Sequence, residues 1–95
     1  MESNKQQANA WKLIFDTTAD RHFTKLDTAV KKRILDFFER TLQLPNPKAK
    51  AVQLSGNKKA FWRYRIGDYR VICRFEDNEM IIVAVKIGHR RDIYH

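Results

Sequence analysis

The sequence predicts an α+β domain in which a two-helix hairpin packs on one face of a small antiparallel sheet, leaving the other face open. Three observations predict this class. Large apolar residues first alternate as in a strand, then recur at helical spacing, and finally gather in three runs rich in aromatic and β-branched residues. The 95 residues suffice for one domain and are too few for two. We therefore expect a flexible tail at residues 1–10 and a single domain at residues 11–95.

The first strand and the helical hairpin occupy the N-terminal half. Large apolar side chains stand at every second position from Trp11 to Phe15, which suits a strand with one buried face. From Thr18 to Thr41 apolar residues recur at helical spacing, and Asp27 has the character of an N-cap that divides this stretch into a short and a longer helix. The longer helix is expected to stop before Pro45, because a proline ring disfavours helix at the preceding residue.

A loop and a three-stranded meander complete the expected fold βααβββ. Residues 45–59 hold two prolines, one glycine and four lysines, which predicts a loop with at most a short strand near Val52–Leu54. The three runs that follow are separated by Gly67-Asp68 and by an acidic turn, as is typical of antiparallel hairpins. The runs are Phe61–Ile66, Tyr69–Phe75 and Met80–Ile87.

A two-residue loop at Gly67-Asp68 fixes which side chains share a face of the sheet. It places Arg65 opposite Arg70 and Tyr64 opposite Val71. The apolar side chains of both strands then lie on one face, which must pack on the helices: Trp62, Tyr64, Ile66, Tyr69, Val71, Cys73 and Phe75. The other face collects Arg63, Arg65, Arg70 and Arg74.

Charge indicates an anionic ligand for this arginine face. Nineteen Lys and Arg against eleven Asp and Glu leave a net charge of +8, which favours polyanions through counterion release. Like charges opposite each other in a sheet repel, and residues 45–74 hold eight basic side chains and one acid, Asp68. Guanidinium groups suit phosphate oxygens. We therefore expect phosphate or RNA binding, with a merely solvated basic face as the alternative, at Arg63, Arg65, Arg74, Lys58 and Lys59 together with Arg70.

The last ten residues add groups that an RNA-cleaving site would use. His89 is the kind of residue that accepts or donates a proton near neutral pH, and a tyrosine such as Tyr94 can donate one to a leaving oxygen. Gly88 permits a bend at the strand end, so that Arg90 and Tyr94 return toward the arginine face. An uninvolved surface histidine and an apolar lid at Tyr94 are the alternatives.

Several other classes of protein are disfavoured. Cys73 is the single cysteine, so no intramolecular disulfide forms and no Cys/His zinc spacing is present. The N-terminus lacks the apolar core of a signal peptide, and no apolar run approaches the roughly 20 residues of a membrane span. We expect a soluble cytoplasmic protein that needs neither metal nor small-molecule cofactor.

A resemblance to a known family is carried by the segment GDYRVICRFEDNEMIIVAVKIGHRRDIY. It resembles the RelE branch of the RelE/ParE toxin superfamily, the bacterial and archaeal toxins of toxin–antitoxin pairs, from about Trp11 to Tyr94. Its specific part is the R-x-R strand, the G-D-Y-R-V hairpin and the V-x-x-G-H-R-x-D-I-Y ending. The resemblance implies a microbial-ribonuclease-like fold and metal-independent cleavage of mRNA in the ribosomal A site. It also implies an acidic antitoxin that silences the toxin.

The resemblance carries site residues over by position. Arg63 and Arg65 match the basic pair of the second strand, Arg70 the arginine after the hairpin, Arg90 the one after Gly-His, and Tyr94 the terminal tyrosine. Family members that cleave use the 2′-hydroxyl to attack the adjacent phosphate. Well-studied members have lysines where this chain has Arg63 and Arg65, and an arginine that stays protonated is a poor general base.

The base and the activity class stay open at this point. His89 is one candidate base, and a cationic face that activates the attacking hydroxyl without a dedicated base is the other. A ParE-like toxin that binds DNA gyrase without cleaving anything would share the fold, as would an inactive nucleic-acid-binding relic. The presence of Arg70, Arg90 and Tyr94 in one neighbourhood favours the nuclease, because a pure binder needs no proton donor there.

Overall fold

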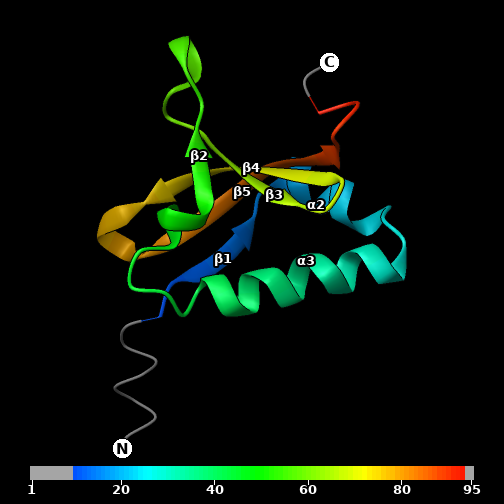
Figure 1. The fold of residues 1–95 in the computed structure, drawn as a ribbon, viewed down its shortest axis with the longest axis horizontal. Helices are drawn as coiled ribbons and strands as arrows, with labels where there is room; N and C mark the ends of the chain where they lie inside the picture. The colour runs from blue at the N-terminus through cyan, green and yellow to red at the C-terminus, as the bar shows by residue number, and fades with distance from the viewer. Residues whose placement is uncertain (1–9, 94–95) are drawn as a thin grey trace, which may run out of the picture.

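The sheet has five strands in the order β1-β5-β4-β3-β2, and two α-helices contribute to its core (Figure 1). The computed structural model describes residues 10–93, so most of the expected tail at residues 1–10 lies outside it. The elements are β1 (Lys12–Phe15), α2 (Thr17–Thr24), α3 (Thr28–Thr41), a 3-10 turn η1 (Pro47–Lys50), β2 (Ala51–Gln53), η2 (Gly56–Lys58), β3 (Trp62–Ile66), β4 (Tyr69–Glu76), η3 (Asp77–Glu79) and β5 (Ile81–His89).

The α+β class is confirmed, with one difference in the sheet. The short strand allowed for near Val52–Leu54 forms as β2, an edge strand that pairs with β3 and places Val52 opposite Arg63. Strand β1 runs parallel to β5, so the sheet is mixed rather than antiparallel. The two helices return the chain to the start of β1, where the Trp11 N–H donates to the Leu42 carbonyl at 3.1 Å.

The helical hairpin forms as predicted, with a cap at each start. Asp16 accepts a hydrogen bond from the Ala19 N–H at 2.9 Å and so fixes the beginning of α2, one residue earlier than expected. Asp27 occupies the N-cap position of α3 in an extended conformation, although its side chain makes no cap hydrogen bond. Helix α3 ends at Thr41, before Pro45, as predicted.

An aromatic cluster joins α3 to the sheet. The rings of Phe38 and Tyr64 meet edge to face with centroids 5.0 Å apart, and Phe37 lies 5.6 Å from Tyr64. The Tyr64 hydroxyl donates a buried hydrogen bond of 2.8 Å to the Pro47 carbonyl, which ties η1 to the core. Burial, with a smaller electrostatic effect of Cys73, raises the pKa of Tyr64 above its ordinary value.

The hairpin register is confirmed pair by pair. Arg65 stands opposite Arg70 and Tyr64 opposite Val71. The expected helix-facing side chains are buried or half-buried, and Tyr64, Val71 and Cys73 are fully buried. The sequence therefore predicted both faces of β3 and β4 correctly.

Strand β5 departs from regular alternation at one residue. Ile72 pairs with Lys86 whereas the next residue, Cys73, pairs with Ala84, so Val85 is the extra residue of a β-bulge. In an unbroken ladder Lys86 would face Val71 on the helix side. The bulge instead turns Lys86 to the open face beside Ile72.

Beyond the end of β1, a side chain of α2 binds the exposed edge of β5. The Ile87 N–H donates to Nδ1 of His22 at 3.1 Å, so a side chain replaces the missing strand there. No helix within residues 10–93 has the length and apolar character needed to cross a membrane.

Candidate functional site

The open face carries two rows of cross-strand partners, which we call the arginine rows. The first row crosses β3, β4 and β5 and consists of Arg65, Arg70 and Gly88. Arg65 pairs with Arg70, which in turn pairs with Gly88. The guanidinium of Arg70 turns back on the hairpin, where Nη1 donates to the carbonyls of Gly67 and Tyr69 at 3.0 Å each. The Arg65 side chain is exposed and forms no ion pair with any residue that the structure describes. Backbone carbonyls thus compensate the charge of Arg70, whereas solvent compensates that of Arg65.

A second row lies two residues further from the hairpin turn. It places Arg63 between Val52 on β2 and Ile72 on β4, and Ile72 pairs in turn with Lys86. Arg63 is half-buried. The second row therefore combines cations with an apolar centre.

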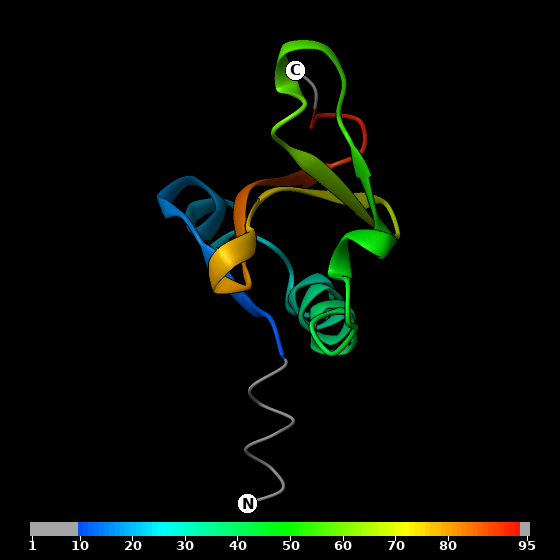
Figure 2. The same cartoon turned by 90° about the vertical axis from the view of Figure 1, so that its left-hand side faces the viewer.

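The chain after β5 folds back over the first row. The N–H groups of Asp92 and Ile93 both donate to the His89 carbonyl, at 2.8 and 3.0 Å. Ile93 is 2% exposed, and a Cβ added to Gly88 would meet its Cδ1 at 3.2 Å. Figures 1 and 2 show residues 90–93 on the side of the sheet away from α3. Ile93 thus packs where a glycine leaves room for it.

Arg90 reaches the same hairpin turn as Arg70. Its N–H donates to the Asp68 carbonyl at 2.7 Å, and its Nε lies 3.8 Å from Asp68 Oδ1 in an exposed ion pair. The backbone bond is the stronger anchor, because an exposed ion pair contributes little. Two arginines distant in sequence therefore converge on Gly67-Asp68.

A third arginine at this turn was missed by the sequence analysis. Arg33 of α3 approaches from the helix side, and its Nη1 would lie 3.0 Å from a Cβ added to Gly67, which has a φ of +59°. Its place on a helix surface of mixed charge gives no signal for this contact. The contact arises only because α3 crosses beneath β3.

The structure places His89 away from the arginine row. His89 pairs with Tyr69, and the two rings meet edge to face with centroids 5.4 Å apart. It therefore lies on the helix-side face, whereas Gly88 faces Arg70. His89 Nδ1 accepts a hydrogen bond from the Arg91 N–H at 3.2 Å. The bulge in β5 is the physical reason, because one extra residue reverses the alternation of all that follow.

The remaining predicted site residues differ in where the structure places them. Arg74 Nε pairs with Glu76 at 3.0 Å, so a nearby acid neutralises this arginine, contrary to expectation. Lys58 lines a pocket, whereas Lys59 does not line it and accepts a hydrogen bond at its carbonyl from Gln53. Tyr94 lies outside the described residues.

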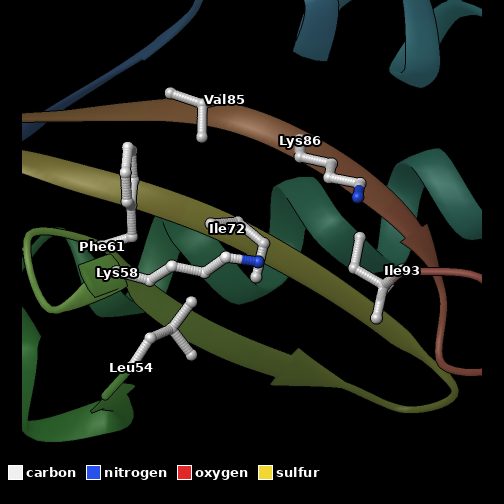
Figure 3. A pocket seen from close by; sticks show the side chains of 7 residues that line it. All are labelled: Leu54, Lys58, Phe61, Ile72, Val85, Lys86 and Ile93. Atoms are coloured by element: carbon white, nitrogen blue, oxygen red, sulfur yellow. The ribbon is translucent and has the colours of Figure 1, made fainter. Parts of the chain in front are cut away.

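The pocket lies over β4, between the β2–β3 connection and β5 (Figure 3). Its volume is about 260 Å³. The lining consists of five apolar side chains and two lysines: Leu54, Phe61, Ile72, Val85, Ile93, Lys58 and Lys86. Val85 and Lys86 are consecutive yet both reach it, which the bulge explains. Within residues 10–93 no group of three or more His, Cys, Asp or Glu side chains is placed to hold a metal ion.

Comparison with known families places the chain. The family model described as the ParE toxin of type II toxin–antitoxin systems, parDE, matches residues 8–94. The chain belongs to this toxin family, within the RelE/ParE superfamily. The expected superfamily is therefore confirmed.

Solved structures of RelE toxins share the fold of this toxin. The RelBE2 toxin–antitoxin complex from Mycobacterium tuberculosis contains a chain 25% identical, with a TM-score of 0.77, covering 87% of this chain and 94% of that one. The archaeal RelE–RelB complex from Pyrococcus horikoshii OT3 gives 24% identity, a TM-score of 0.69, and coverages of 87% and 98%. The isolated E. coli RelE toxin gives 21% identity, a TM-score of 0.68, and 84% coverage of both chains. No curated protein matches the toxin.

Proposed function

We propose that this toxin is a metal-independent endoribonuclease that cleaves mRNA, in the ribosomal A site, and so stops translation in the cytoplasm. The observation that supports the proposal is the convergence of Arg70 and Arg90 on one hairpin turn beside the exposed Arg65. Such a cluster suits a phosphate whose negative charge increases in the transition state.

In the proposed reaction the 2′-oxygen forms a bond to the adjacent phosphorus and the bond from phosphorus to the 5′-oxygen breaks. The products are a 2′,3′-cyclic phosphate and a 5′-hydroxyl. We assign Tyr94 to donate the proton that the leaving 5′-oxygen takes up, because it follows Ile93, which packs on Gly88 in the first row.

Arg70 is the main phosphate clamp in this proposal. A guanidinium has five N–H donors, and the two on Nη1 of Arg70 are engaged by the turn. Nη2 and Nε therefore keep donors for phosphate oxygens. Arg90 and Arg65 are assigned the same role from either side.

The other predicted residues take lesser roles. Arg63, Lys58 and Lys59 are assigned phosphates further along the strand. Arg74 is omitted from the clamp because Glu76 holds its Nε at 3.0 Å, closer than the 3.8 Å between Arg90 Nε and Asp68 Oδ1. No base is assigned to His89, since the geometry does not bring it to the arginines. The cationic face instead lowers the pKa of the attacking 2′-hydroxyl, and its proton passes to water.

The proposed partner is an acidic antitoxin. The similar structures from Mycobacterium tuberculosis and Pyrococcus horikoshii OT3 are RelBE2 and RelE–RelB complexes, and a net charge of +8 favours an acidic chain as well as RNA. The antitoxin would cover the arginine face and so exclude the ribosome.

Gyrase binding is the second candidate, and the name of the matching family model favours it. Induction of the toxin alone, followed by primer extension on translated mRNA, separates the two. We expect cuts within translated codons, which Arg70→Ala and Tyr94→Phe reduce at least about 100-fold. Uncut mRNA together with DNA damage and inhibited gyrase supercoiling would establish the second candidate instead.

A further inference from the structure

The pocket on the open face combines an apolar body with a cationic rim. Phe61, Ile72 and Val85 offer one aromatic and two branched apolar surfaces, while Lys58 and Lys86 bring ammonium groups (Figure 3). None of the described lining residues is acidic. An occupant with a flat apolar part and flanking negative charge matches this lining.

The position of the pocket relates it to the arginine rows. Ile72, which lines it, stands between Arg63 and Lys86 in cross-strand register. Arg70 lies two residues away along β4, a separation of about 7 Å in an extended strand. A phosphate held by the first row therefore leaves its attached or neighbouring base close to the pocket.

We propose that this pocket is a nucleobase subsite for one nucleotide of a single strand bound across the arginine rows. The base packs on Phe61 and on the branched side chains of Ile72 and Val85, and Lys58 and Lys86 hold the flanking phosphates. Aromatic platforms in positively charged grooves bind single strands in this way, with little preference among bases because every base has a π-face. The inference rests on the proposed function, to which it adds a second contact with the substrate.

The β-bulge is the second observation that supports the subsite. If Val85 instead paired with Ile72 in an unbroken ladder, Lys86 would face Val71 and the pocket would lose one of its two cations. Bulges often re-aim a side chain next to a functional site. In the observed register Lys86 lies on the open face beside the arginine rows, where its ammonium group can contact a phosphate.

Binding to oligodeoxynucleotides tests the subsite apart from cleavage, because DNA lacks the attacking 2′-hydroxyl. Fluorescence anisotropy at two salt concentrations compares a labelled hexadeoxyadenylate with the same strand carrying an abasic position. We expect the full strand to bind about 5- to 150-fold more tightly than the abasic one. Phe61→Ala should remove this ratio and leave the salt slope unchanged.

Matched variants separate stacking from charge and from folding. Phe61→Leu keeps the bulk of the side chain without the ring and should lose most of the ratio, with an unchanged thermal melting curve. Lys58→Met and Lys86→Met should keep the ratio and lower the salt slope by about 0.7 each. Leu35→Ala and Lys25→Met, exposed on α3 and just after α2, should match wild type in both readouts.

Three results would overturn the subsite. They are equal affinity of wild type for the two strands, no binding to either at low salt, and a Phe61→Ala variant that still discriminates. If Phe61→Ala instead weakens only an acidic peptide with one central leucine, the pocket belongs to a protein partner. Discrimination without mRNA cleavage would leave the subsite standing and the nuclease refuted, whereas cleavage without discrimination would refute the subsite alone.

Discussion

Arg70 is held by the protein before any ligand arrives, and this distinguishes it from its cross-strand neighbour. Two hydrogen bonds to turn carbonyls orient its guanidinium, whereas the Arg65 side chain is exposed to solvent. A pre-oriented donor gives electrostatic stabilisation without reorganisation during the reaction. At the residue scale, Arg70 is therefore expected to matter more for catalysis and Arg65 more for general affinity.

Substitution of Arg70 and of Tyr94 should reduce cleavage in different ways. Arg70→Ala removes a clamp worth about 2.7 to 4 kcal/mol by analogy with an oxyanion-hole donor, and it weakens RNA binding. Tyr94→Phe loses only a hydroxyl, so cleavage should fall about 10²- to 10⁴-fold with affinity retained. Cleavage rates on translated mRNA and ribosome binding at two salt concentrations measure both. Wild-type rates for both variants would refute these assignments.

Tyr64 is expected to contribute to the stability of the fold through its buried hydrogen bond to the Pro47 carbonyl. Tyr64→Phe leaves the Pro47 carbonyl without its buried hydrogen bond, which should cost about 1–3 kcal/mol in a denaturant titration. Tyr69→Phe, at a half-buried position, is the control and should cost less than about 1 kcal/mol. Equal losses in the two variants would show that the hydrogen bond to Pro47 contributes nothing.

Alkaline pH gives a second readout of Tyr64. Burial raises the pKa of Tyr64 in the folded state, so above about pH 10 only the unfolded chain loses the proton. Stability should therefore fall as pH rises through that range, and the fall should be shallower in Tyr64→Phe. Cys73, whose pKa burial also raises, keeps part of the effect in both proteins. An identical slope in the variant would contradict the burial argument.

At the scale of elements, the hairpin could be predicted from the sequence and the strand after it could not. A two-residue loop at Gly67-Asp68 determines every residue pair between β3 and β4, so the turn alone predicts which side chains lie on each face of the sheet. The bulge at Val85 has no such local signal in the sequence, because it is a property of how β5 pairs with β4. The extra residue also explains why His89 lies on the helix-side face of the sheet, away from the arginines with which the sequence grouped it.

Gly88 and Ile93 form the contact that returns the C-terminal turn to the first row. Gly88→Val would crowd Ile93 and displace residues 90–93, so cleavage should fall by up to about 100-fold. Overpacking should cost only about 1–3 kcal/mol of stability. Ile93→Ala in the same chain makes room and should restore part of the rate. A Gly88→Val variant with full activity would separate this contact from the site.

At the scale of the whole molecule, charge is distributed by layer. Residues 45–67 contain no acidic side chain, whereas five acids lie in or beside the two helices: Asp16, Asp20, Asp27, Asp36 and Glu39. The open face is therefore the side that a polyanion approaches. This polarity was predictable from sequence, but the parallel pairing of β1 was not, since composition carries no strand direction.

The salt dependence of RNA binding should report this polarity. Arg65→Gln should lower the slope of log affinity against log salt by about 0.7, the value for one phosphate contact on a single strand. Arg21→Gln, in the last turn of α2, removes the same charge from the helix layer and should leave the slope unchanged. Titrations of a single-stranded RNA between low and moderate salt measure both. Equal slopes for the two variants would mean that net charge alone drives binding.

Strand β5 contains one residue, Val85, that has no partner in β4, so the strand can lose this residue without a change in its pairing. Deletion of Val85 would leave a regular ladder in which Lys86 still stands opposite Ile72 and Gly88 opposite Arg70. Elsewhere in a paired strand a missing residue exchanges the inner and outer faces of everything that follows it. Toxins of this family could therefore shorten here by one residue without rearranging the arginine rows, losing only one wall of the pocket.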